Sequence, residues 1–583
     1  MNKLHFLALL MVIIAGISSP GVQSNTVKAV SHDTFDAGMV NSSATNSSGV
    51  KVLHIQGREY SRFDPQMTAN NAQATLEGAL FRGLLRYDEN SNPAPSIALE
   101  VPTIANGGIS ADGLTYIYKL REWKWSDGKG VVTAQDFVYA FQRLVDPKAG
   151  SPYGSLLNGI VVNATDIQNG KQPVSSLGVK ALDDKTLQVT LVKPASYFNA
   201  IASMWITYAV RKDNVERTGL PKDSSWTDPA YGVVVGSGPF IITKWDHNKE
   251  IVFERNPNYS GTPAKLDDID QIVITDSKIA YAAYQNNELD ISGFPSDLFS
   301  TLKSDPALHQ YKAACTNYLG MNNVNPPFDN KLVREAFSYA IDRDTREHVV
   351  DNDINVKQLS WLPEGVPGYD PSLGTQFDFN ADKAKKALAD AGYPDGKGLP
   401  EITFNYVSSS DGQKTADWYK EQFKDVLNVD LKLNPIDLKT YLESFNDPAK
   451  RLTGLYEWGW CADYLHPSDW MQFVFGTNQA NNVVGYSNPQ FDKVSMAADA
   501  ELDPKKAADE YRQAQELLIA DVPVVFLNTP TATKLVKPRV LNLTPNALDG
   551  GVIGGFFWEN IDLAVDNSTS QAALPTAVAT KAQ

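Results

Sequence analysis

The only two cysteines of the chain, Cys315 and Cys461, are the feature that most limits its fold. They lie far apart in the sequence, so a disulfide between them would hold two distant segments side by side. In an exported chain an even pair of cysteines is more often a disulfide than two free thiols. We therefore expect residues 315 and 461 to be neighbours in space, with two free thiols as the alternative.

The first residues of the chain are typical of a secretory signal peptide. Lys3 precedes an apolar run over residues 6–15 (FLALLMVIIA), and Val22 and Ser24 suit a cleavage site after residue 24. The run is too short to span a bilayer. No cysteine follows the cleavage site closely, so a lipid anchor is not expected. We predict that residues 1–24 are removed and that the protein is soluble outside the cytoplasm, not a lipoprotein.

The length and charge of the chain limit its organisation and its partners. At 583 residues it is too long for a single core. Its 52 basic and 68 acidic side chains give a net charge of −16, which argues against binding to nucleic acid or to an anionic membrane surface. We expect several structural units and no nucleic-acid partner.

Short apolar patterns with two different periods alternate along the chain. Patterns with the period of a helix occupy residues 71–85, 133–145, 333–341, 384–391, 418–426 and 509–519. Patterns that predict strands occupy residues 52–55, 187–192, 240–245, 251–253, 402–406 and 522–527. Thr133 and Asp136 have the spacing of a capping box at a helix start. This alternation predicts a mixed α/β fold.

Residues that could carry catalysis are sparse. The chain has seven histidines and lacks the usual hydrolase, metalloprotease and nucleotide-binding motifs. Asp463, His466 and Asp469 could be imagined as metal ligands, but three such donors in seven residues are weak evidence. We expect no enzyme activity, no metal and no cofactor.

The most unusual segment is residues 456–464 (YEWGWCADY), which combines four large aromatic side chains with two carboxylates. The aromatic residues alone favour a buried core strand. Asp463 does not fit that interpretation, because a buried carboxylate without a counter-charge costs several kcal/mol. Its partner could be a structural arginine or the ammonium group of a ligand.

Several stretches of the chain resemble the family of periplasmic oligopeptide-binding proteins, the receptors of peptide-importing ABC transporters. They are residues 120–128 (LREWKWSDG), 133–138 (TAQDFV), 236–240 (GSGPF), 334–343 (REAFSYAIDR) and 459–464 (GWCADY). The resemblance covers about residues 50–562. It implies a monomeric receptor in the periplasm that encloses a peptide between two hinged lobes and delivers it to the permease. It also implies a disulfide between Cys315 and Cys461.

The resemblance implies a three-lobed periplasmic-binding-protein-like fold. Lobe I would comprise residues 50–81, 212–314 and 532–562, lobe II residues 82–211, and lobe III residues 315–531. Residues 25–49 would form a flexible leader and residues 563–583 a flexible tail. Two connections between lobes I and III would act as the hinge.

The resemblance also assigns roles to individual residues. Asp463 would pair with the α-ammonium group of the peptide, and Gly459 and Cys461 would bond its backbone. Trp460 would line a side-chain pocket, Tyr153 would reach in from lobe II, and Asn71 would contribute main-chain bonds from lobe I.

Two positions depart from the family pattern. Glu457 stands where relatives place an arginine that neutralises a tripeptide carboxylate, and Gln413 stands where they place a histidine that serves longer peptides. We therefore expect a changed charge preference, longer ligands, or a cation beside Glu457, for which Lys450 and Arg451 are the nearest candidates in sequence.

The expected function is capture of oligopeptides for an ABC importer. One alternative is a related receptor for a murein peptide, an opine or a sugar. Another is a secreted hydrolase with an unrecognised site.

Overall fold

The computed structural model describes residues 49–69, 71–217, 220, 225–446, 450–479, 481–549 and 553–564. The predicted signal peptide, almost all of the predicted leader and most of the predicted tail lie outside the described residues. Within the described ranges, no helix is both long enough and apolar enough to cross a membrane.

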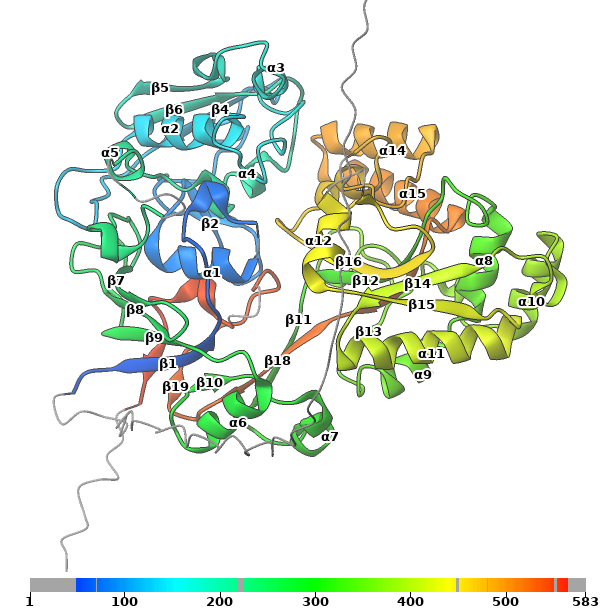
Figure 1. Ribbon diagram of the computed structural model, residues 1–583. Helices are drawn as coiled ribbons and strands as arrows, with labels where there is room; N and C mark the ends of the chain where they lie inside the picture. Colours follow the sequence, from blue (N-terminus) through cyan, green and yellow to red (C-terminus); the bar gives the residue numbers. More distant parts are fainter. Residues whose placement is uncertain are drawn as a thin grey trace, which may run out of the picture. The chain divides into compact units, whose positions relative to one another are not determined.

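The largest sheet has seven strands in the order β11-β18-β10-β1-β9-β8-β7 (Figure 1). Its strands are β1 (Val52–Gly57), β7 (Phe240–Asp246), β8 (Glu250–Arg255), β9 (Asp268–Val273), β10 (Ile291–Ser292), β11 (Leu308–Lys312) and β18 (Thr531–Val536). They come from three separate parts of the chain, and β1 pairs in parallel with β9 and β10. Apart from Thr531 at the start of β18, they fall within the ranges predicted for lobe I, whose boundaries remain a prediction.

A three-stranded sheet is formed by β4 (Thr115–Lys119), β6 (Thr186–Thr190) and β5 (Val179–Asp183). Helix α2 (Ala134–Val145) packs against it through Phe137, Phe141 and Leu144, which are all buried. The Asp136 carboxylate accepts hydrogen bonds from the Thr133 N–H and hydroxyl, both at 2.8 Å. The predicted capping box is therefore confirmed.

The third sheet contains six strands in the order β13-β17-β12-β16-β14-β15. They are β12 (Cys315–Met321), β13 (Val356–Lys357), β14 (Ile402–Val407), β15 (Leu431–Ile436), β16 (Leu455–Cys461) and β17 (Val524–Thr529). Helix α11 (Ser410–Leu427) lies along β14 and β15, with α8 (Lys331–Ala340), α9 (Arg343–Val349) and α10 (Ala381–Asp390) nearby (Figure 1). Leu319, Phe337, Phe404 and Phe423 form part of the core between sheet and helices.

The remaining elements are shorter or lie outside these sheets. They are α1 (Asn71–Leu80), α3 (Ala164–Gln168), α4 (Phe198–Ile201), α5 (Lys212–Val215), α6 (Ser277–Gln285), α7 (Phe299–Leu302), α12 (Leu438–Asn446), α13 (Gln472–Phe475), α14 (Pro489–Ala500), α15 (Pro504–Asp521), β2 (Leu85–Tyr87), β3 (Pro93–Pro95), β19 (Val540–Leu541) and β20 (Asp562–Leu563).

The helix predicted over residues 71–85 ends at Leu80, so its last five residues were predicted wrongly. The Leu80 C=O accepts hydrogen bonds from the N–H groups of Ser237 and Gly238, at 2.9 and 2.8 Å. These tertiary bonds take the acceptor that another helical turn would need. The chain then enters β2 instead.

Two short crossings connect the seven-stranded and six-stranded sheets. Strand β11 continues into β12 through residues 313–314, and β17 continues into β18 through Pro530. The pairs β11–β18 and β12–β17 are both antiparallel, and the Ala313 N–H donates to the Pro530 C=O at 3.2 Å. The two crossings are therefore neighbours, an arrangement that suits the predicted hinge.

The predicted disulfide is present. Cys315 on β12 and Cys461 on β16 are paired residues in the register of the two strands, with 4.0 Å between their Cα atoms. The bond closes the chain between residues that are 146 positions apart. The alternative of two free thiols is wrong.

We predict that replacing both cysteines by serine lowers the free energy of unfolding. The chain-entropy model gives on the order of 5 kcal/mol for so long a loop, which we take as the upper limit of the loss. Urea titration of the wild type and of Cys315→Ser/Cys461→Ser measures it. A reductant should destabilise the wild type and leave the double variant unchanged; equal stability of the two proteins would contradict the prediction.

Candidate functional site

Strand β16 has one fully paired edge and one edge that is mostly unpaired. It pairs with β12 along its whole length, from Leu455 to Cys461. On its other edge it pairs in parallel with β14 only at Leu455 and Tyr456. In the described part of the chain no strand pairs with that edge from residue 457 to residue 461. An extended ligand could be added there as a strand.

The backbone groups at this edge alternate in direction. The Ala462 N–H donates to the Ala314 C=O at 2.8 Å, on the β12 side, whereas the Glu457 C=O accepts from the Tyr441 hydroxyl at 2.5 Å. Every second residue of a strand faces the same edge. The N–H and C=O groups of Gly459 and Cys461 therefore face the unpaired edge, as their predicted role requires.

Gly459 is also constrained from inside the sheet. A Cβ atom at this position would lie 2.4 Å from the Asn317 Oδ1 and 3.0 Å from the Thr316 C=O. Any side chain would collide with β12. Glycine is thus needed here to make room for Asn317, which sequence reasoning did not identify.

Large aromatic side chains flank the unpaired edge. Trp458 stacks on Phe445 of α12 with 3.8 Å between ring centroids, and Trp460 meets Phe473 edge to face at 5.5 Å. Both tryptophans are only half-buried. The interpretation of this segment as a buried core strand therefore holds for Tyr456 and Tyr464 but not for the two tryptophans, and Trp460 remains available to line a pocket.

Asp463 lies two residues beyond the end of β16 and is 5% exposed. Its Oδ1 accepts a hydrogen bond from the Tyr153 hydroxyl at 2.7 Å, and its Oδ2 is buried without a partner. Burial raises the pKa of this carboxyl to about 7. Among the described residues no lysine or arginine forms an ion pair with Asp463, so the structural arginine that the sequence left open is not the partner.

A second buried carboxylate, Asp469, lies against the first. Its Oδ2 accepts from the Asp463 N–H at 2.8 Å and from the Trp460 indole at 3.3 Å, while its Oδ1 has no partner. Burial, together with the neighbouring Asp463, raises the pKa of Asp469 well above its usual range. The pair therefore combines two unmatched acceptor atoms with a strong local need for positive charge.

The imagined metal site does not form. Across the described ranges no group of three or more histidine, cysteine, aspartate or glutamate side chains could hold a metal ion. His466 instead pairs with the Ser468 hydroxyl and packs on Tyr197 and Tyr511. Burial lowers the pKa of His466 to about 3, which leaves it neutral.

Residues from distant segments meet at the end of β16. The Asn71 amide at the start of α1 donates to the Ala462 C=O at 3.1 Å, and Tyr153 reaches Asp463. Segments assigned by sequence to lobes I, II and III thus converge on residues 462–463. The predicted ligand-binding roles of Asn71 and Tyr153 remain predictions, but both residues lie at the site.

Glu457 lies beside a cation, although not one of its sequence neighbours. Its Oε1 accepts from Arg346 Nη2 of α9 at 2.5 Å and from the Tyr419 hydroxyl at 2.6 Å. Lys450 pairs with Glu443 at 2.8 Å. No sequence signal could have identified Arg346, which lies 111 residues away from Glu457.

Gln413 is exposed in the first turns of α11. Its amide donates to Asp417 at 2.9 Å and accepts from the Tyr406 hydroxyl at 2.6 Å. Tyr406 follows directly after the β14 residue that pairs with β16. Gln413 is thus placed on the same side of the sheet as Glu457, and its part in ligand binding remains a prediction.

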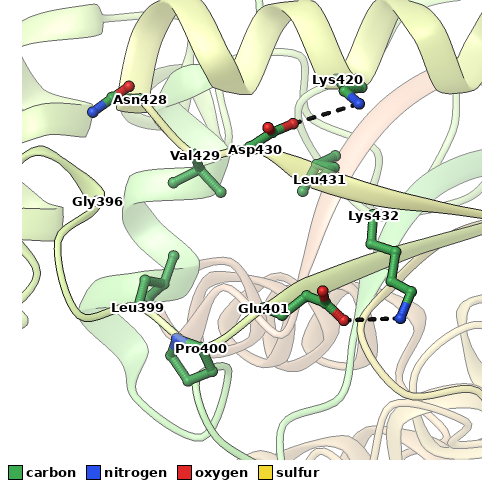
Figure 2. A pocket seen from close by; sticks show the side chains of 10 residues that line it. All are labelled: Gly396, Leu399, Pro400, Glu401, Lys420, Asn428, Val429, Asp430, Leu431 and Lys432. Atoms are coloured by element: carbon green, nitrogen blue, oxygen red, sulfur yellow. Dashed lines mark hydrogen bonds and ion pairs between the residues drawn. The ribbon is translucent and has the colours of Figure 1, made fainter.

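A polar pocket at the other end of β14 is a poor candidate for the site (Figure 2). It lies at the amino ends of β14 and β15, whereas β16 is unpaired beyond the middle of β14. Its lysines are paired, Lys420 with Asp430 at 3.5 Å and Lys432 with Glu401 at 3.0 Å. These charged side chains are exposed and already paired, so they need no ligand to balance them.

The sheets, the two crossings and the unpaired strand define a solute-binding protein. Residues 95–482 match the family described as bacterial extracellular solute-binding proteins, family 5 Middle. The chain belongs to this family of extracellular solute-binding proteins, and its sequence-based recognition is confirmed.

Two curated relatives match along most of the chain. It is 31% identical over 500 residues to the periplasmic oligopeptide-binding protein OppA of Escherichia coli, covering 84% of this chain and 89% of the relative. It is 32% identical over 508 residues to OppA of Salmonella typhimurium, with the same coverage.

Solved structures agree with this fold. The oligopeptide-binding protein OppAIV of Borrelia burgdorferi superposes with a TM-score of 0.75 at 30% identity, covering 88% of this chain and all (100%) of that one. OppA of Haemophilus influenzae, in complex with the peptide RPPGFSPFR, gives 0.72 at 27% identity over 88% and 99%. The murein tripeptide-binding protein MppA of Escherichia coli gives 0.74 at 27% identity, also over 88% and 99%. The predicted α/β solute-binding fold is confirmed.

The buried Asp463 makes the stability of the ligand-free protein depend on pH. A carboxyl whose pKa is raised on folding stabilises the protein fully below about pH 4, and this contribution is lost as the pH rises to about 7. We predict that Asp463→Asn, which cannot ionise, removes part of this loss. The difference should be on the order of 1 kcal/mol or more.

Urea titrations of both proteins at pH 4.5 and pH 7.5, without ligand, measure this effect. The control is Asp430→Asn, which changes an exposed carboxylate at the far end of the sheet. If Asp463→Asn and the wild type lose the same stability between these pH values, the carboxyl is not buried as described.

Proposed function

We propose that this protein captures oligopeptides outside the cytoplasm, releases them unchanged, and delivers them to the permease of an ABC importer. The observation that carries the proposal is the unpartnered Oδ2 of Asp463, buried at the end of an unpaired strand edge. The α-ammonium group of a peptide supplies the missing charge, and its backbone supplies the missing strand.

A peptide can satisfy both parts of the site, the unpaired edge of β16 and the buried carboxyl of Asp463. An extended peptide beside β16 would exchange backbone hydrogen bonds with Gly459 and Cys461, whatever its side chains are. Such recognition tolerates many sequences, since water can bridge to side chains that do not fill their pockets. The ammonium group fixes one end, because a buried carboxylate without a counter-charge is costly.

The names of the relatives support a peptide as the ligand. The solved relatives include an OppA with the bound nonapeptide RPPGFSPFR and a murein tripeptide-binding protein. A murein peptide also carries backbone amides, so it remains the second candidate among ligands. Mass spectrometry of ligand that co-purifies with the protein would distinguish these ligands from an opine or a sugar.

Nothing in the site requires chemistry on the ligand. Cys461 is committed to the disulfide and His466 is neutral and bonded to Ser468. Asp463 and Asp469 each have one oxygen held by a neighbouring donor. A receptor returns its peptide intact, whereas a hydrolase would consume it. Incubation of a peptide with the protein should therefore leave the peptide mass unchanged.

We predict that Asp463→Asn weakens binding of peptides with a free amino terminus by more than a hundredfold. Removing one partner of an enclosed charge pair costs about 3–5 kcal/mol, and each 1.4 kcal/mol is a factor of ten. Peptides with an acetylated amino terminus should bind poorly even to the wild type.

Isothermal titration calorimetry with alanine peptides, free and acetylated, measures both effects. Asp430→Asn, at the opposite end of the sheet, serves as the matched control and should bind like the wild type. Equal affinity of wild-type protein for free and acetylated peptides would refute the role of Asp463.

We predict that the protein closes on its ligand through the two crossings at residues 313–314 and 530. The crossings are short and adjacent, so rotation about them can move the two large sheets as units. Small-angle X-ray scattering should give a smaller radius of gyration with a bound peptide than without one. An unchanged radius at saturating peptide would rule out a hinge closure.

A further inference from the structure

The face of β16 that carries Glu457 and Gly459 presents an open carboxylate oxygen. Side chains of a strand alternate between faces, so positions 457 and 459 share one face. Arg346 and Tyr419 bond Oε1 of Glu457, and no described residue bonds its Oε2. The side chain of Glu457 is 30% exposed, so it is not sealed in the core.

The cation beside Glu457 is shared with other carboxylates. Arg346 is 3% exposed, and its Nη1 donates to Asp351 at 2.5 Å and to Glu347 at 3.1 Å. Burial and the adjacent Asp351 raise the pKa of Glu347. One guanidinium thus serves three carboxyl groups, so this cluster holds more acidic groups than cations.

Apart from Arg346, no described residue forms an ion pair with Glu457. Lys414 of α11 is exposed, and its Nζ donates to the Val350 C=O at 3.1 Å. The Asn528 amide donates to Glu347 at 2.7 Å and to Asp351 at 3.0 Å, and it is neutral. Glu347 keeps one buried oxygen, Oε2, without any partner.

On this face of β16, the polar atoms that no described residue bonds are hydrogen-bond acceptors. The Asn317 amide nitrogen is committed to the Asn528 Oδ1 at 2.9 Å, so Asn317 turns its own Oδ1 toward Gly459. Together with the Glu457 Oε2, this face therefore offers acceptor atoms beside a cluster in which one guanidinium serves three carboxyl groups. A group rich in donors and positively charged fits such a surface best.

We propose that Glu457 and Asn317 form a subsite for a cationic side chain of the ligand, that of a lysine or an arginine. The proposal rests on the proposed function, because it needs a peptide strand beside β16. A residue of such a strand projects its side chain on the same face as the β16 residue opposite it. A side chain near Glu457 and Gly459 thus meets their acceptors directly.

The proposed pairing of the peptide's amino end with Asp463 limits which peptide residues can reach Glu457. With its amino end at Asp463, the peptide runs antiparallel to β16, back toward Glu457. Glu457 lies four residues before Cys461 on the strand, so residues three to five of the peptide pass it. The preference should appear at one of these positions and not at the first.

The test uses calorimetry with alanine pentapeptides in which one lysine is moved through positions two to five. Each is compared with the matched norleucine peptide, which has a similar apolar chain without the charge. We expect lysine to bind at least tenfold tighter than norleucine at one position. The advantage should shrink as salt is raised, because Glu457 is partly exposed.

The same titrations with Glu457→Gln should remove the lysine advantage while norleucine peptides still bind. Glu401→Gln, an exposed glutamate at the far end of β14, is the matched control and should keep the advantage. The thermal unfolding midpoint of each variant verifies that it is folded. The salt series on the wild type tests the proposal without any variant.

The outcomes separate this proposal from the proposed function. If all the peptides bind and lysine gains less than twofold at every position, the subsite is wrong and the peptide receptor stands. The subsite is also wrong if the lysine advantage survives in Glu457→Gln. If neither lysine nor norleucine peptides bind the wild type, both proposals fail together.

Discussion

The pairing of β16 with β12 is the constraint on which the site depends. It runs from Leu455 to Cys461 and is closed at its end by the disulfide between Cys315 and Cys461. Because β12 holds one edge of β16 in this register, the other edge presents Gly459 and Cys461 outward. The same register sets Asn317 beneath Gly459 and brings Asp463 to the end of the strand. The six-stranded sheet therefore fixes the position of this unpaired edge.

The second main feature of the site is that its buried carboxyl groups outnumber the cations beside them. Asp463 and Asp469 lie together and pair with no lysine or arginine among the described residues. One guanidinium, that of Arg346, serves Glu457, Asp351 and Glu347. Buried carboxylates of this kind reduce stability unless something compensates them. Both clusters lie at the unpaired edge or its end, so a cationic ligand group would relieve a cost that the empty protein carries. A site whose buried carboxylates destabilise the ligand-free protein can be selective, because only ligands with a positive charge remove that destabilisation.

Local patterns were enough to predict much of the fold. The capping box at Thr133 and Asp136 is present, and the strand predicted over residues 402–406 is β14. Errors arose where tertiary contacts replaced local ones. The helix predicted to residue 85 ends at Leu80, because Ser237 and Gly238 donate to its last carbonyl. Helix α11 begins eight residues before the predicted residue 418, at Ser410, since its first turns are polar and exposed and the pattern of apolar residues misses them.

The sequence by itself determined the class of protein, the disulfide and the candidates Asp463, Gly459, Cys461, Trp460, Tyr153 and Asn71. It could do so because these features are carried by local motifs and by the count of cysteines. Only the tertiary structure decided which charges meet: Arg346 with Glu457, Asp469 with Asp463, and Asn317 under Gly459. Two of these contacts join residues more than a hundred positions apart, and the third depends on how a short turn folds back. Electrostatic energy depends on distance in space and on burial, and neither can be read from positions along a chain.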